Sequence, residues 1–238
     1  MTQKFPSKVL VVALFVLAIL AVVGYIPGPR PGPATIAPTQ FLGQTYYVNN
    51  AAGAGCNDSN AGTSSAAPWC TINKAVKTLQ AGDTAYVSPG TYDIGAGPGF
   101  ESSVYVQAYD KNVPVVRLAN AGTQSQPIRL IGLSTAANII GGGPGSDDDT
   151  NQVFITGGAI YADSGKNYWE FQGLYFKRGG GLAADHVTGF TVRDSLIRVH
   201  PSWVFSEGAP FEGGYPLNVY DGTNILFDHL ELWSLYMG

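Results

Sequence analysis

Three nine-residue segments place apolar residues at matching positions, and this repeat is the strongest constraint on the fold. The segments are YWEFQGLYF (168–176), GFTVRDSLI (189–197) and NILFDHLEL (224–232). Aligned without gaps, they form four columns: Trp169, Phe190 and Ile225; Phe171, Val192 and Phe227; Leu174, Ser195 and Leu230; and Phe176, Ile197 and Leu232. Such columns predict side chains that point inward and stack between successive structural repeats.

The spacing of the columns indicates how the repeats are built. Neighbouring members lie 21 and then 35 residues apart, and a period in the low twenties is typical of a solenoid with three short strands per turn. Because Leu182 and Leu217 are also 35 residues apart, we place a 14-residue insertion between Val199 and Leu217. We therefore predict an all-β fold, a right-handed parallel β-helix with three sheets, over residues 45–238.

One helical pattern precedes these repeats. Residues 71–80 bring four apolar side chains to one face at helical spacing: Ile72, Ala75, Val76 and Leu79. Gly82 follows as a stop signal. Because the open end of a solenoid exposes apolar side chains and unpaired backbone groups, we expect this short helix to cap the amino-terminal end.

The first 26 residues predict export. Residues 9–26 are apolar or glycine and follow two lysines, which is typical of a signal peptide or of an uncleaved membrane anchor. The length favours the anchor, and small residues near Gly24 form only a weak cleavage site. Residues 27–44 are rich in proline and glycine at their start and are expected to form an extended linker.

Charge and cysteine content narrow the partners and the chemistry. The net charge is -4, so the chain has no basic surface for a phosphate backbone, and we expect no nucleic-acid partner. Cys56 and Cys70 are the two cysteines. In an exported chain, a closely spaced pair favours a disulfide over a metal or redox site.

Several framework motifs follow one another along the chain. They are the entry segment DSNAGTSSAAPW, the capping helix and the GDTAYVSPGTY strand that follows it, with GTQSQPIRLIG and NYWEFQGLYF further on. Together they resemble the framework of pectate-lyase-like β-helix proteins. This superfamily includes pectate lyases and the alginate lyase and chondroitinase B group. The resemblance covers residues 46 to about 234 and implies the fold, a polysaccharide partner and, in the lyases, a calcium ion with a lysine or arginine base. No lysine follows Lys177, and we transfer no catalytic residue.

A candidate binding surface follows from the aligned repeats. Residues 182–185 and 217–221 are expected to be equivalent strands on the face that similar proteins use as a groove. The insertion before the second strand carries Trp203 and Tyr215, whose rings suit the apolar faces of sugars. Polar side chains of the second strand complete the predicted site: Asn218, Tyr220 and Asp221.

Two acidic features are candidate metal ligands. Asp147 and Asp149 flank Asp148 in a loop, which suits either calcium or a solvated turn. Asp228 lies in FDHLELWS, which resembles a pectate lyase string whose aspartate binds metal. The alternative at Asp228 is a salt-bridge ladder, because Arg193 is expected beside Asp228 in the neighbouring repeat.

These observations predict an exported carbohydrate-active protein. The first hypothesis is the amino-terminal part of a lyase that cleaves uronate polysaccharides, since the last strand lacks a cap and we expect the chain to continue. The alternative is a non-catalytic glycan-binding, adhesin or cell-surface module. A glycoside hydrolase would need paired carboxylates, for which Asp185 and Asp221 are the candidates. The catalytic residues and the oligomeric state stay unassigned.

Overall fold

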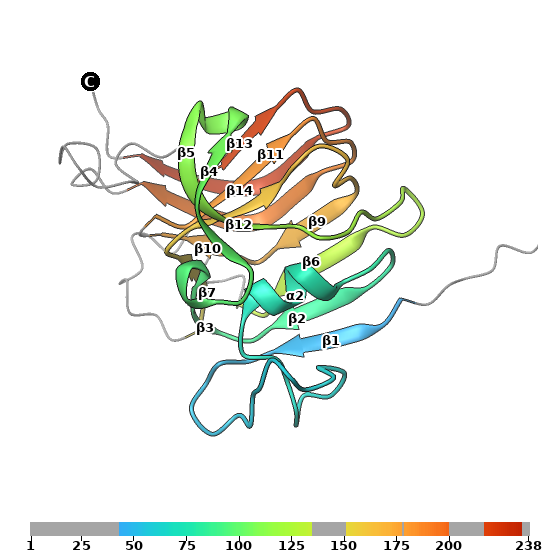
Figure 1. The fold of residues 1–238 in the computed structure, drawn as a ribbon. Coiled ribbons are helices and arrows are strands. Elements are labelled where there is room, and N and C mark those ends of the chain that lie inside the picture. Colours follow the sequence, from blue (N-terminus) through green and yellow to red (C-terminus); the bar gives the residue numbers. More distant parts are fainter. Residues whose placement is uncertain (1–42, 135–150, 178, 200–216, 235–238) are drawn as a thin grey trace, which may run out of the picture. The chain divides into compact units, whose positions relative to one another are not determined.

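The computed structural model describes residues 43–134, 151–177, 179–199 and 217–234. All described residues belong to one compact unit within residues 41–238. This unit is all-β with mostly parallel strands, as predicted, and the described part contains one α-helix and two short 3-10 helices (Figure 1). No helix in these ranges is long and apolar enough to cross a membrane.

The strands form two sheets. The nine-stranded sheet contains β1 (Thr45–Val48), β2 (Thr84–Val87), β3 (Gly90–Asp93), β6 (Ile128–Gly132), β7 (Val153–Thr156), β9 (Trp169–Gln172), β10 (Tyr175–Phe176), β12 (Thr191–Val199) and β14 (Leu226–Ser234). The five-stranded sheet contains β4 (Phe100–Val106), β5 (Lys111–Arg117), β8 (Ala159–Ala162), β11 (Gly181–Asp185) and β13 (Leu217–Tyr220). Every pair is parallel except β4 with β5.

The chain visits the sheets in a repeating order. β6, β7 and β8 follow one another, and β9, β10 and β11 then pair beside them in the same order. The long strand β12 pairs with β9 through its first half and with β10 through its second half. The nine-stranded sheet therefore bends within β12, at the corner that the repeat alignment predicts.

The register of the strands confirms the predicted columns. Phe171 is the Cα partner of Val192, which is the partner of Phe227. Leu182 and Leu217 are also partners, which confirms the 35-residue spacing. Each large apolar side chain that is fully buried in these columns stabilises the fold by about 1.5–3 kcal/mol. Phe227 keeps the register but is 47% exposed, because β14 is an edge strand of the described part.

The corner itself uses left-handed backbone. Gly173, Asp194 and His229 occupy equivalent positions after β9 and within β12 and β14, and their φ angles are 68°, 46° and 48°. Glycine adopts this region without strain, and Asp and His tolerate it better than most residues. The predicted two-residue polar corner is therefore a turn that the sequence can make in each repeat.

Helix α2 (Ile72–Thr78) begins one residue after the predicted start, because Thr71 is its N-cap, and ends two residues early. The Thr71 hydroxyl accepts the Lys74 amide and caps the first turn. The Gln80 amide donates to the Asp83 carboxylate at 2.9 Å, so the chain leaves the helix before Gln80. The predicted apolar face is buried in the main core: Ile72, Ala75, Val76 and Leu79.

The disulfide between Cys56 and Cys70 is confirmed. It closes a loop that is also held by the Asp58 carboxylate, which accepts the amides of Cys70 and Thr71 and the Thr71 hydroxyl. Because Thr71 caps α2, the loop and the helix are joined by one hydrogen-bond network. The two cysteines therefore have the structural role that was predicted.

Candidate functional site

The predicted binding surface lies on the outer face of the five-stranded sheet. The inner face carries a column of apolar residues in register, Val116, Ile160, Leu182 and Leu217. Because side chains alternate along a strand, the next residue of each strand points outward. This outer row consists of Arg117, Tyr161, Ala183 and Asn218.

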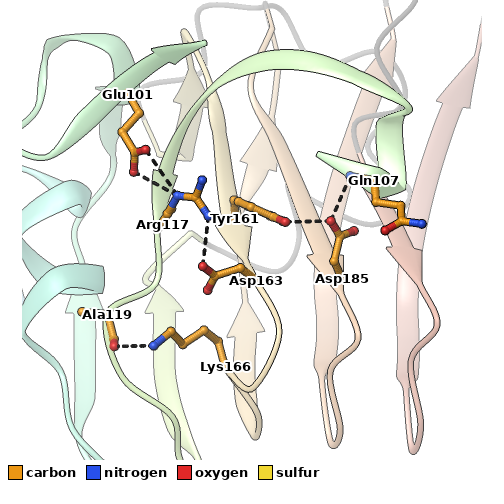
Figure 2. Close-up of polar contacts among 8 residues, drawn as sticks. All are labelled: Glu101, Gln107, Arg117, Ala119, Tyr161, Asp163, Lys166 and Asp185. Carbon is orange, nitrogen blue, oxygen red and sulfur yellow. Dashed lines mark hydrogen bonds and ion pairs between the residues drawn. The ribbon is translucent and has the colours of Figure 1, made fainter. Parts of the chain in front are cut away.

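An antiparallel hairpin covers much of this outer face, which the sequence analysis treated as an open groove. The hairpin consists of β4, the 3-10 helix η2 (Gln107–Tyr109) and β5. Its side chains form a second apolar cluster with the sheet beneath: Val104, Val106, Ala108, Val113 and Val115 from the hairpin, and Ala159, Tyr161 and Ala183 from the sheet. Figure 2 shows the hairpin ribbon arching from Arg117 to Gln107.

Asp185 joins the tip of this hairpin to the sheet. Its carboxylate accepts the backbone amides of Gln107 and Ala108, both at 2.9 Å, and the hydroxyl of Tyr161 at 2.7 Å (Figure 2). Asn218 adds a second contact, since its side-chain amide donates to the Ala108 carbonyl. Asp185 is only 5% exposed, so its charge is stabilised by donors that surround it.

An ion-pair network lies at the other side of the covered face. Arg117 contacts Glu101 at 3.1 Å and Asp163 at 3.0 Å, and its guanidinium lies 5.3 Å from the centre of the Tyr161 ring (Figure 2). Burial alone lowers the pKa of Arg117, but the hydrogen bonds and charges of Asp163 and Glu101 raise it overall. Burial and the hydrogen bond to Asp185 raise the pKa of Tyr161 well above 10, so its hydroxyl remains a donor.

Three polar or aromatic side chains gather where β11 and β13 end, and Asn218, earlier on β13, joins them to the hairpin tip. We call this group the β11–β13 cluster: His186, Asn218, Tyr220 and Asp221. The rings of His186 and Tyr220 lie 5.4 Å apart in an edge-to-face arrangement. His186 Nε2 lies 3.6 Å from Asp221 Oδ2. Tyr220 is 43% exposed, and the side chains of His186 and Asp221 are 44% and 70% exposed.

The backbone explains why these residues meet. His186 and Asp221 both have left-handed backbone, with φ angles of 53° and 50°, and each directly follows its strand. The His186 amide donates to the Tyr220 carbonyl, which continues the parallel pairing by one residue. Below this turn, the hydroxyls of Thr188 and Thr223 are 2.8 Å apart. The two turns therefore stack and present their side chains at one edge.

The structure brings together three of the predicted binding residues and adds one. Asn218, Tyr220 and Asp221 lie in the cluster, while Trp203 and Tyr215 lie outside the described residues. His186 was not predicted as a binding residue, although its position equivalent to Asp221, 35 residues earlier, was a usable signal. The carboxylates of Asp185 and Asp221 differ strongly, because Asp185 is buried under the hairpin and Asp221 is exposed.

The candidate metal ligands are not gathered in the described part of the chain. Asp147 and Asp149 lie outside it. Asp228 pairs with His229 at 2.9 Å, and Arg193 is its Cα partner on the neighbouring strand, which is the position expected for Arg193. No group of three or more His, Cys, Asp or Glu residues is arranged for a metal ion within the described ranges, and these ranges alone do not supply a calcium ligand set. The calcium assignment stays a prediction.

Comparisons with known proteins match parts of this architecture. A family described as a protein of unknown function (DUF1565) matches residues 54–107, which hold the disulfide loop, α2 and β2 to β4 but no residue of the β11–β13 cluster. A search of curated proteins finds no match.

Solved structures of two kinds are similar to the chain. A rhamnogalacturonan lyase has a TM-score of 0.44 at 16% identity, with 80% of this chain and 52% of the lyase covered. A lacto-N-biosidase from Eubacterium ramulus has a TM-score of 0.41 at 13% identity, with 79% of this chain and 42% of the biosidase covered. The chain thus spans about half the length of the lyase.

Proposed function

We propose that this chain is an exported right-handed parallel β-helix protein, similar to the pectate-lyase-like group, that binds a polysaccharide through the β11–β13 cluster. Three observations support the β-helix: the repeated strand order, the parallel register and the stacked corners. The disulfide supports export, because such bonds persist in oxidising compartments. Residues 1–26 remain the proposed signal peptide or membrane anchor.

The observation that carries the binding proposal is the exposed pair of rings formed by His186 and Tyr220. A sugar offers an apolar face that packs on an aromatic ring and hydroxyls that need hydrogen-bond partners. Tyr220 supplies the ring, and the Asp221 carboxylate beside it accepts hydroxyl donors. An exposed aromatic ring next to an exposed carboxylate is therefore suited to a carbohydrate.

The charges around the cluster favour a neutral glycan or one that brings its own cation. The described acidic groups on this side of the sheet include Glu101, Asp110, Asp163, Asp185 and Asp221. Arg117 is neutralised by two carboxylates, and the Lys166 ammonium donates to the Ala119 carbonyl at 2.9 Å (Figure 2). A uronate chain would meet net negative charge here unless calcium accompanies it.

The same contacts favour binding over elimination at this site. A lyase base must reach the proton beside the uronate carboxylate, and Arg117 and Lys166 are both held in structural contacts. The uronate lyase is the second candidate function. It is supported by the resemblance of the framework motifs.

A binding and cleavage panel separates the two functions. The full chain is tested against galactan, xylan, polygalacturonate, alginate and chondroitin sulfate, with calcium and with a chelator. The proposal predicts binding without formation of unsaturated products. Unsaturated products from any uronate chain would replace it with the lyase, and no binding to any polymer would overturn both.

A further inference from the structure

The β4–β5 hairpin has the construction of a separable flap. Its distal part, residues 104–113, lies over the outer face of the five-stranded sheet, and the apolar contacts of this part belong to a small cluster that is distinct from the main core. At the base of the hairpin, Phe100 and Val116 pack in the main core instead. The cluster contains valines and alanines with one ring, Tyr161. Lifting this distal part, with β5 still paired to β8 at the base, would expose the small cluster and leave the main core intact.

The hairpin tip also holds its own shape. The Tyr105 hydroxyl donates to the Asp110 carboxylate at 2.7 Å, and the Asp110 amide donates to the Gln107 carbonyl at 3.1 Å. Both bonds lie within the hairpin and need no partner from the sheet. The polar contacts between the tip and the strands below it come from Asp185 and Asn218.

These two side chains adjoin the proposed glycan site. Asp185 is the Cα partner of Tyr220, and Asn218 is two residues before it. A carboxylate and an amide that now hold backbone groups of the tip are the same chemical groups that bind sugar hydroxyls. The Tyr161 ring and Ala183 lie next to them under the hairpin and would form an apolar floor for a sugar ring.

We propose that the distal part of the β4–β5 hairpin is a flap that competes with a glycan for Asp185 and Asn218. In the closed state, the amides of Gln107 and Ala108 occupy the Asp185 carboxylate. In the open state, hydroxyls of a neutral sugar replace them, and the site extends from Tyr220 to Tyr161. This inference rests on the proposed function. It adds to the glycan site the strip of sheet that the hairpin covers, from Asp185 to Tyr161.

If the hairpin is a flap, weakening its contacts with the sheet should raise the affinity for glycan. Only the open fraction of molecules binds at the covered strip, so the apparent Kd falls as that fraction grows. Val106 is fully buried in the small cluster and is not itself one of the proposed binding groups. Val106→Ala is expected to lower the apparent Kd for a galactan hexasaccharide by about threefold or more.

A matched core variant serves as the control. Val87 is equally buried but belongs to the main core, so Val87→Ala destabilises the fold without favouring the open hairpin. Val104→Ala, on the hairpin, provides a second test that does not depend on one variant folding well. The inference is overturned if both hairpin variants bind the hexasaccharide with unchanged or lower affinity than the wild type.

Amide hydrogen exchange tests the same competition in the unmodified chain. The galactan hexasaccharide is expected to speed exchange at the Gln107 and Ala108 amides, because it displaces them from Asp185. Slower exchange at these amides on binding would contradict the flap.

Failure of the flap is distinguishable from failure of glycan binding. If no variant binds any glycan, the proposed function is wrong, and the proposed competition between flap and glycan is wrong as well. Hydrogen exchange of the chain without glycan still shows whether the hairpin opens. Local opening makes the Gln107 and Ala108 amides exchange faster than those of β8 and β11, and Val106→Ala accelerates exchange at these two tip amides alone. Equal rates in tip and sheet would show that the hairpin is a fixed part of the fold.

Discussion

The Asp185 carboxylate accepts the backbone amide of Gln107, 78 residues earlier in the chain, at 2.9 Å. This contact fixes the tip of an antiparallel hairpin on a sheet that is otherwise parallel. It also places a buried carboxylate beside the exposed β11–β13 cluster. Asp185 therefore affects both the stability of the fold and the access of a ligand to the outer face of the sheet.

Replacing Asp185 tests its role in stability. Asp185→Ala leaves two backbone amides and the Tyr161 hydroxyl without their acceptor, and we expect the free energy of unfolding to fall by about 2–4 kcal/mol. Asp185→Asn keeps one acceptor oxygen and is expected to cost less. Urea denaturation measures both. Asp221→Ala is the control, since this exposed carboxylate is expected to change stability by less than about 0.5 kcal/mol; equal effects at both positions would contradict the account.

The disulfide is expected to stabilise the loop that precedes α2. Replacing Cys56 and Cys70 together by serine should lower the free energy of unfolding by about 3 kcal/mol, the value for closing a loop of this length. Denaturation of the wild type with a reductant should give a similar loss. A reduced chain as stable as the oxidised one would show that the Asp58 network holds the loop without the bond.

The N-cap of α2 gives a smaller effect. Thr71→Ala removes the acceptor for the Lys74 amide, and we expect a loss of about 1 kcal/mol in the free energy of unfolding. Thr63→Ala, at an exposed position of the same loop, is the comparison and should have little effect. Equal changes from the two variants, measured by thermal or chemical denaturation, would argue against the cap.

Alkaline pH should destabilise the fold through Tyr92. Burial raises the pKa of the Tyr92 hydroxyl to about 12, whereas the unfolded chain loses this proton near pH 10. Its contribution is therefore complete below pH 10 and is lost as the pH rises from 10 to about 12, a fall of about 2–3 kcal/mol. Tyr92→Phe should flatten this part of the stability curve. An unchanged slope in the variant would exclude Tyr92 as the cause.

The repeats could be predicted because burial imposes a period on the sequence. Phe171, Val192 and Phe227 share a column since each repeat must place an apolar side chain at the same inward position. The helix was predictable for the same reason, but its end was not. That end depends on Asp83, whose carboxylate accepts the Gln80 amide only after the chain has turned.

The hairpin and its contacts could not be predicted in this way. β4 (FESSVYV) and β5 (KNVPVVR) mix apolar with polar residues, which a strand of either pairing direction can do, so the pattern gives no sign of antiparallel pairing. The bond from Asp185 to Gln107 depends on how distant strands are placed in space. His186 was missed because a single histidine has no local pattern, although the 35-residue alignment with Asp221 pairs their positions.

The most direct test of glycan binding at the β11–β13 cluster is calorimetric titration of Tyr220→Ala with the galactan hexasaccharide. Tyr86→Ala is the matched control, because Tyr86 is a partly exposed ring on the other sheet. We predict that Tyr220→Ala weakens binding at least tenfold, which corresponds to about 1.4 kcal/mol, while Tyr86→Ala binds like the wild type. Equal affinity of wild type and Tyr220→Ala would contradict the proposed site.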